Sequence, residues 1–478
     1  MKKIIYLIAL YLAFASCDDF LDYKDNDKVV PSNLEHYSEL IAGELIFKRV
    51  GATCYNLWLM GDDYGSYVPS WIDERTMDNR EDYRSWYGWA KESQISPKGD
   101  ELIDPSWEHF YHKILMCNII ESDVNEFADD PEGVKARLLG EVKVLRAISY
   151  WYLVNIYGDP YRSEEQAKMG MGVPINTETS IKDYLYKRAT LHEVYELIEC
   201  DLKDGMKDLE RGEEKNTIFR PNKDLVRLFL SRIYLEQRKY EDVIAVCNDA
   251  LKETTRAIIP VSELLTYKDS EKPMLNKNNN SILFSWMERE SYPGSSSEYS
   301  SGRYWPSEEL VALYASNDVR GYGDVFWDSW KQYLRKYKAG KSGCGDMNYR
   351  VEEFYFNRAE AYIALGKWEL GMEDVNQVYS QRLENEIGQL KAENADDAYE
   401  ELWKEKRREF CFEDIRWFDI RRRGERVEHK YHNFSMDGTY VTYVLEKESP
   451  NYVSPLPLDI QRRNFDIEQP ERIEIKAN

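Results

Sequence analysis

The chain lacks a long apolar run beyond its N-terminus. Its one uninterrupted apolar stretch runs from Ile4 to Phe14, whereas a helix that spans a bilayer needs about 20 apolar residues. No later stretch is both apolar and long enough to cross a membrane. We therefore expect the body of the protein to lie outside the bilayer.

Catalytic motifs are also absent. The 6 histidines form no H-E-x-x-H pair, and the sequence holds no G-x-S-x-G and no G-x-G-x-x-G. The adjacent carboxylates Asp62-Asp63 and Glu352-Glu353 could serve a surface glycosidase, but such pairs are expected by chance among 87 acidic residues. The sequence predicts a protein that is not an enzyme.

The sequence has few cysteines, and they do not have the spacing of metal ligands. The 7 cysteines include no C-x-x-C pair, so the usual zinc spacing is missing. Asp62 and Asp63 offer hard oxygen ligands, but calcium takes six to eight oxygens. We predict no cofactor and no metal site. A structural calcium ion is the alternative, although no motif supports it.

Basic residues are fewer than acidic residues. The chain carries 64 Lys and Arg against 87 Asp and Glu, a net charge of −23. Phosphate backbones would repel such a surface, which excludes nucleic acid as an expected partner.

What is present begins with an export signal. Lys2 and Lys3 precede the apolar stretch, and the small residues Ala15 and Ser16 precede Cys17. This layout predicts a signal peptide over residues 1–16 and a lipid anchor on Cys17, followed by a tether over 17–34. The alternative is an ordinary signal peptide with an incidental cysteine.

An internal repeat indicates a helical scaffold. Residues 231–248 align without a gap to residues 359–376, and Tyr240 matches Trp368 at the start of each second helix. Each unit predicts two antiparallel helices that bury their apolar faces against neighbouring pairs, as in tetratricopeptide repeats. The fold class we expect is mostly α, with a few short strands.

Two long insertions, about 50–107 and 252–350, interrupt this scaffold with Gly, Pro, Ser and aromatic residues. Flat aromatic rings beside hydrogen-bonding side chains suit a sugar, whose C–H face stacks on indole or phenol. The alternative is that these rings pack the loops onto the helices. Our predicted ligand-binding residues are Tyr64, Trp71, Arg84, Trp86, Trp89, Tyr292, Trp327 and Trp330.

The segment 404–426 is the most highly charged. Its spacing predicts helical ion pairs Glu405–Arg408, Glu413–Arg416 and Asp419–Arg423. We interpret it as a structural helix-turn-helix rather than a nucleic-acid patch.

Six separated stretches resemble one family, the SusD/RagB-like outer-membrane lipoproteins. The stretches, in family order, are CDDFLD (17–22), LRAISYWYLVNIYGDPY (145–161), the segment from Pro306 to Arg320, EEFYFNRAEAYIALGKWELGMEDVNQV (352–378), KEKRREFCFEDIRWFDIRRRG (404–424) and PLPLDI (455–460). Asp414 stands where the family usually has Gly.

The resemblance implies a single domain over 35–478, with tetratricopeptide-like pairs as scaffold and irregular loops as ligand face. It implies a lipid-anchored, cell-surface glycan-binding protein without catalysis. Its expected partner is a SusC-like TonB-dependent transporter, over which it acts as a lid that delivers oligosaccharide. The alternatives are a peptide- or glycopeptide-binding member of the same family and a tetratricopeptide-type interaction scaffold.

Overall fold

The computed structural model describes residues 31–48, 53–66, 81–181, 185–268, 270, 272–287, 304–321, 325–326, 336, 343–385, 388–433 and 439–478. The predicted signal peptide, Cys17 and most of the tether lie outside these residues. So do the predicted ligand residues Trp71, Tyr292, Trp327 and Trp330. Within the described part of the chain, no helix has the length and apolar character that a membrane span requires.

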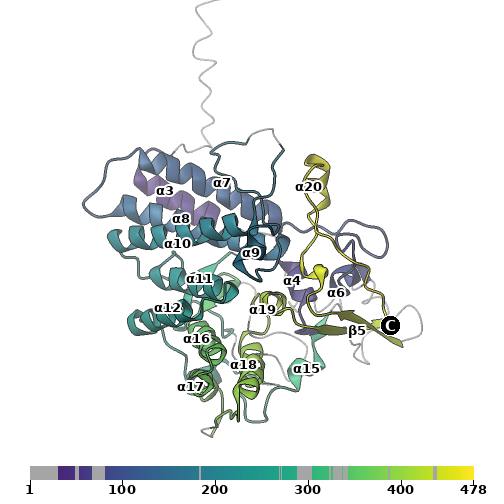
Figure 1. The fold of residues 1–478 in the computed structure, drawn as a ribbon. Helices are drawn as coiled ribbons and strands as arrows, with labels where there is room; N and C mark the ends of the chain where they lie inside the picture. The colour runs from purple at the N-terminus through teal and green to yellow at the C-terminus, as the bar shows by residue number, and fades with distance from the viewer. Residues whose placement is uncertain are drawn as a thin grey trace, which may run out of the picture.

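In the described part of the chain, eight long helices form the scaffold, and they lie side by side in a stack (Figure 1). In chain order they are α7 (Ser106–Asn125), α8 (Val134–Tyr157), α10 (Leu191–Arg211), α11 (Lys223–Glu236), α12 (Tyr240–Glu253), α16 (Glu352–Ala364), α17 (Trp368–Tyr379) and α18 (Ala395–Phe410). The mostly α fold that the sequence predicts is therefore confirmed.

α8 is the central helix of the upper part of this stack. It packs between α7 and α10, and most of its side chains are buried. Its sequence is apolar around the whole circumference near its C-terminal end, which is typical of a helix enclosed by neighbours. α10 begins with a capping box in which Thr190 and Glu193 satisfy each other's backbone N–H groups.

The predicted repeat is confirmed as two stacked helix pairs. α11 and α12 form the first pair, α16 and α17 form the second, and α12 packs directly on α16. The turns are equivalent as well, because Arg238 (φ 59°) and Gly366 (φ 74°) both adopt the left-handed conformation. In sequence, residues 254–351 separate the two pairs.

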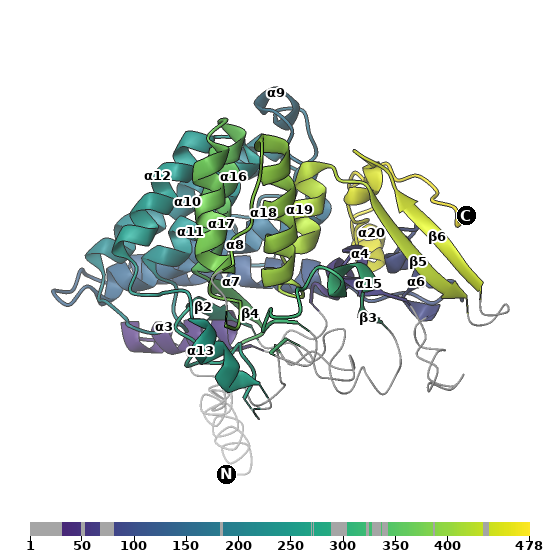
Figure 2. The same cartoon turned by 90° about the horizontal axis from the view of Figure 1, so that it is seen from below.

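The remaining elements are short, and those near the C-terminus, drawn in yellow, lie beside the stack (Figure 2). The helical ones are α3 (Leu34–Leu40), η1 (Ile41–Ile46), α4 (Tyr55–Met60), α6 (Arg84–Tyr87), α9 (Glu164–Ala167), α13 (Val261–Leu264), η3 (Leu265–Tyr267), α15 (Glu308–Val311), α19 (Arg416–Arg423), η4 (Pro450–Tyr452) and α20 (Leu458–Arg463). The strands are β1 (Tyr64–Gly65), β2 (Ile282–Trp286), β3 (Trp305–Pro306), β4 (Met347–Arg350), β5 (Val427–Asn433) and β6 (Thr439–Leu445). They pair antiparallel as β1–β3, β2–β4 and β5–β6.

The charged segment forms a helix-turn-helix of α18 and α19, as the sequence predicts, but two of its three predicted ion pairs are wrong. Glu405 does pair with Arg408 at 2.7 Å. Glu413 pairs with Arg350 instead of Arg416, and Asp419 pairs with Lys406 and Arg422 instead of Arg423. Helical spacing predicts partners three or four residues away. In the structure, charged side chains from more distant positions, such as Arg350 and Lys406, lie closer to these carboxylates.

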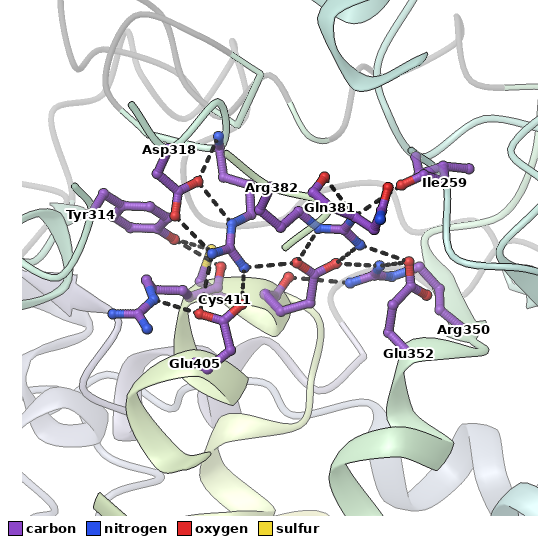
Figure 3. Close-up of polar contacts among 12 residues, drawn as sticks. Ile259, Tyr314, Asp318, Arg350, Glu352, Gln381, Arg382, Glu405 and Cys411 are labelled. Atoms are coloured by element: carbon purple, nitrogen blue, oxygen red, sulfur yellow. Dashed lines mark hydrogen bonds and ion pairs between the residues drawn. The ribbon is translucent and has the colours of Figure 1, made fainter. Parts of the chain in front are cut away.

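Those distant partners form a buried charge network on α18 (Figure 3). The Glu409 carboxylate accepts hydrogen bonds from Arg320, Arg350 and Arg382, with N–O distances of 2.7 to 2.9 Å. The whole buried set balances five cations against five carboxylates: Arg320, Lys336, Arg350, Arg382 and Arg408 with Asp318, Glu352, Glu405, Glu409 and Glu413. Burying such charges is tolerated only when each is paired, so the network ties Asp318, Arg320, Lys336 and Arg350 of the later insertion to α18 and its C-terminal turn.

Candidate ligand-binding cleft

Strand β1 joins two parts of the chain that are distant in sequence. On one side Tyr64 and Gly65 pair with Pro306 and Trp305 of β3. On the other side Ser66, directly after β1, bridges Tyr431 of β5. β1 therefore lies between the later insertion and the β5–β6 hairpin.

These three segments enclose a cleft of about 660 Å³. Volumes of roughly 300–1,000 Å³ are usual for small-molecule sites. The cleft is lined by Asp62, Tyr64, Gly65, Ser66, Tyr87, Ser307, Glu308, Glu309, Arg407, Arg426, Val427, Glu428, His429, Lys430 and Tyr440.

The floor of the cleft is fixed by ion pairs. Arg407 of α18 lies 3.3 Å from an Asp62 oxygen and 3.1 Å from Asp63 Oδ1, and the Ser307 hydroxyl donates to the Asp62 carbonyl at 2.8 Å. Burial alone would raise the pKa of Asp62, but the Arg407 and Arg416 guanidinium groups lower it well below the usual range. A carboxylate held ionised in this way is a structural anion and not a general acid.

One wall of the cleft is the outer face of the β5–β6 hairpin. Along β5 the odd-numbered residues from Val427 to Tyr431 are buried, whereas Arg426, Glu428 and Lys430 are exposed, as the two-residue period of a strand requires. On β6, Tyr440 stands opposite His432 and is 52% exposed. The two rings meet edge to face at 4.9 Å, so His432 holds the phenol ring in place.

The other wall is the start of α15. Ser307 caps this short helix by accepting from the Leu310 N–H at 3.2 Å. Glu308 and Glu309 follow immediately and are both exposed. Because β3 leads directly into Ser307, these carboxylates lie on the side of β1 opposite the hairpin.

Three aromatic rings are stacked beside the cleft, and two of them, Tyr87 and His429, line it. The His429 ring lies between Tyr87 at 4.3 Å and Trp89 at 4.1 Å, and its Nδ1 lies 2.8 Å from the Tyr87 carbonyl oxygen. Burial lowers the pKa of His429 to about 4. The Trp89 indole donates to the Met60 carbonyl at 3.0 Å. The three aromatic rings therefore join the described part of the first insertion to the hairpin.

The positions of these aromatic rings correct part of the predicted ligand site. Trp89 is fully buried and Trp86 is 4% exposed, so neither ring presents a face on which a ligand could stack. Tyr64 lines the cleft but is 2% exposed. Arg84 pairs with Glu81 at 2.9 Å and lies over the Tyr431 ring. For these residues the alternative interpretation, packing of loop onto scaffold, is the one the structure supports.

Several cleft residues were missed at the sequence level, namely Tyr440, Lys430, Glu308 and Glu309. The alternation of exposed and buried residues in RVEHKYH (426–432) is a strand signal that could have identified the hairpin wall. Trp71 follows the cleft residue Ser66 by five positions, and Tyr292 precedes β3 in the chain. The assignments of Trp71, Tyr292, Trp327 and Trp330 to the ligand site stay predictions.

The acidic pairs considered for catalysis are occupied by arginine. Glu352 lies 2.9 Å from Arg382, and Glu353 lies 2.6 Å from Arg232. Both are buried. Within the described ranges, no group of three or more His, Cys, Asp or Glu side chains is placed to hold a metal ion.

Fold and cleft together define a tetratricopeptide-like helical scaffold that carries a polar surface cleft. Two family models match the chain. One, described as "Starch-binding associating with outer membrane", matches residues 19–235, and the SusD family model matches residues 279–469. The chain belongs to the SusD/RagB-like family.

Known relatives agree with this assignment. The curated SusD-like protein P25 of Formosa agariphila is 24% identical over 190 residues, a match that spans 38% of this chain and only 32% of that relative. A SusD superfamily protein of Bacteroides thetaiotaomicron has a TM-score of 0.69 at 17% identity, covering 92% of this chain and 100% of that one. A SusD-like carbohydrate binding protein of Bacteroides vulgatus has a TM-score of 0.66 at 16% identity, covering 91% and 96%.

Proposed function

We propose that this protein is a carbohydrate-binding lipoprotein of the outer membrane and that the cleft beside β1 is its glycan site. The observation that carries the proposal is the half-exposed Tyr440 ring, held by His432 in a cleft whose other exposed groups are charged. An aromatic face beside hydrogen-bonding groups is the arrangement that a sugar ring needs. The family description and the carbohydrate-binding relative of Bacteroides vulgatus support it.

The protein anchors through Cys17 and passes its oligosaccharide to a SusC-like TonB-dependent transporter, over which it closes as a lid. Residues 17–34 form the tether between lipid and scaffold. We propose no catalytic step, and the arginine partners of Asp62, Glu352 and Glu353 support this proposal.

Calorimetry with a panel of oligosaccharides tests the binding proposal. The wild-type protein should bind at least one glycan, and Tyr440→Ala should weaken that binding about five- to thirtyfold, since one stacked ring contributes on the order of 1–2 kcal/mol. Phe465→Ala is the control, because Phe465 is an exposed aromatic residue (75%) outside the cleft lining. Equal loss in both variants, or no loss in Tyr440→Ala, would contradict the site.

Membrane fractionation tests the anchor and the partner. Cys17→Ala should release the protein from the outer membrane while its glycan affinity in solution stays unchanged. The wild-type protein should co-purify with a TonB-dependent transporter after mild detergent extraction. Retention of Cys17→Ala in the membrane would show that the chain is held there by something other than a lipid.

A further inference from the structure

The two walls of the cleft carry opposite charges. The hairpin wall presents the ammonium group of Lys430, and the α15 wall presents the carboxylates of Glu308 and Glu309. β1 separates the walls, since it pairs with β3 on one side and Ser66 bridges β5 on the other. A ligand that lies along β1 therefore has a cation on one flank and two anions on the other.

The remaining charges of the cleft are neutralised within the protein. Arg407 is matched by Asp62 and Asp63, and Arg426 is matched by Glu428 at 2.5 Å. His429 is uncharged at neutral pH because burial lowers its pKa to about 4. Among the described residues, Lys430, Glu308 and Glu309 are the cleft-lining charges that form no ion pair.

Anionic ligands are at a disadvantage between such walls. An anionic glycan meets the two carboxylates of Glu308 and Glu309 against the single ammonium group of Lys430. Each like-charge approach at about 4–5 Å costs roughly 1 kcal/mol in a water-like medium and more where water is excluded. The net charge of −23 adds a longer-ranged repulsion of polyanions.

A hydroxyl group suits both walls, because it donates to a carboxylate and accepts from an ammonium group. Lys430 and Tyr440 share the outer face of the hairpin in neighbouring rows, with Thr442 opposite Lys430 and His432 opposite Tyr440. A sugar ring stacked on Tyr440 thus has hydroxyl groups within reach of the hairpin cation. We infer that the cleft selects electroneutral, hydroxyl-rich oligosaccharides over polyuronates and sulfated glycans. This inference rests on the proposed function.

Matched oligosaccharides test the inference. Hexasaccharides that share a linkage but differ in charge (neutral, or oxidised at C6 to the uronate) are compared by calorimetry at low and high salt. The tightest ligand of a wider panel should be neutral. Its uronate counterpart should bind at least about fivefold more weakly at low salt, the equivalent of one repulsion of about 1 kcal/mol, and this ratio should shrink at high salt.

Charge-neutral variants separate electrostatic selection from shape. The double variant Glu308→Gln/Glu309→Gln retains hydrogen-bonding groups of the same size and should narrow the neutral-to-uronate ratio while affinity for the neutral ligand stays within about threefold. Lys430→Met removes the unpaired cation of the lining, so it should widen the neutral-to-uronate ratio. The inference is overturned if the tightest ligand is anionic or is a peptide, or if the neutral-to-uronate ratio is insensitive to both salt and substitution. If no glycan of any charge binds, the proposed function fails first.

Discussion

Arg416 and Asp62 form a bidentate ion pair, in which Nε lies 2.6 Å from Oδ1 and Nη2 lies 2.8 Å from Oδ2. The pair joins α19 to the segment that follows α4, although the two residues are more than 350 positions apart in the sequence. Arg407 of α18 reaches the same carboxylate. The floor of the cleft is therefore part of the scaffold, not a loop laid over it.

Asp62→Asn should destabilise the protein, because it leaves Arg407 and Arg416 mostly buried with one anion fewer between them. We expect a loss of about 3 kcal/mol in the free energy of unfolding, measured by urea denaturation. Glu101→Gln is the control. It breaks the exposed pair with Arg462 and should cost less than about 1 kcal/mol. A similar loss of stability in both variants would show that the ion pairs of the cleft floor contribute no more to folding than an exposed ion pair.

Glu409→Gln should be more damaging. The carboxylate is fully buried and accepts from three arginines, and its pKa is held well below the usual range by Arg382 and Arg350 in spite of burial. Removing the charge leaves the network with an excess cation, for which we expect about 3–5 kcal/mol of destabilisation and a low soluble yield. Glu401→Gln, on the same helix and paired with Lys404 near the surface, should leave stability nearly unchanged. A stable, well-expressed Glu409→Gln protein would contradict the importance of charge balance.

Acid should weaken the protein through His429. Burial lowers its folded pKa to about 4, whereas the unfolded imidazole has a pKa near 6.5. The unfolded chain thus takes up a proton at a pH where the folded protein does not, so stability is lost as pH falls from about 6.5 to 4, by roughly 3 kcal/mol. Burial lowers the pKa of His109 to about 4 as well, and its effect has the same sign.

Denaturation curves from pH 7.5 to 4 check this expectation. His429→Phe keeps a ring between Tyr87 and Trp89 but cannot be protonated, so its stability should fall less over the same range. His36→Gln, at the start of α3, should retain the full pH dependence. If His429→Phe retains it too, the acid sensitivity arises elsewhere.

The sequence was sufficient to predict the scaffold because its signals are local. Tyr240 and Trp368 open equivalent helices, and the period of α8 is readable in one segment. The buried ion pairs were not predictable in this way. Glu413 has Arg416 at helical spacing but binds Arg350, a residue 63 positions away, because the insertion that carries Arg350 folds back onto α18.

The candidate site was harder to predict for the same reason. The residues of the cleft come from β1, α15, α18 and the hairpin, and no spacing rule joins segments whose proximity depends on tertiary pairing. The first insertion is dense in aromatic residues, but its Trp86 and Trp89 are buried and serve packing. Only solvent exposure distinguishes such rings from Tyr440, and the local sequence does not predict solvent exposure.

Asp414 is the one position where a departure from the family pattern can be tested directly. Gly is usual there, and the structure explains why, since Asp414 has φ 61°. Asp tolerates this left-handed conformation better than most residues, and its Oδ1 accepts a hydrogen bond from the Trp58 indole. The hydrogen bond thus offsets backbone strain that Gly would avoid.

Three substitutions of Asp414 separate the two effects. Asp414→Asn retains both the conformation and an acceptor, so its stability should match the wild type. Asp414→Gly loses the acceptor but relieves the backbone, and the two changes of about 1 kcal/mol each should nearly cancel. Asp414→Ala loses the acceptor and keeps the strain, so it should be about 2–3 kcal/mol less stable than wild type in urea denaturation. Equal stability of the Ala and Gly variants would mean that the left-handed backbone at this turn carries no strain.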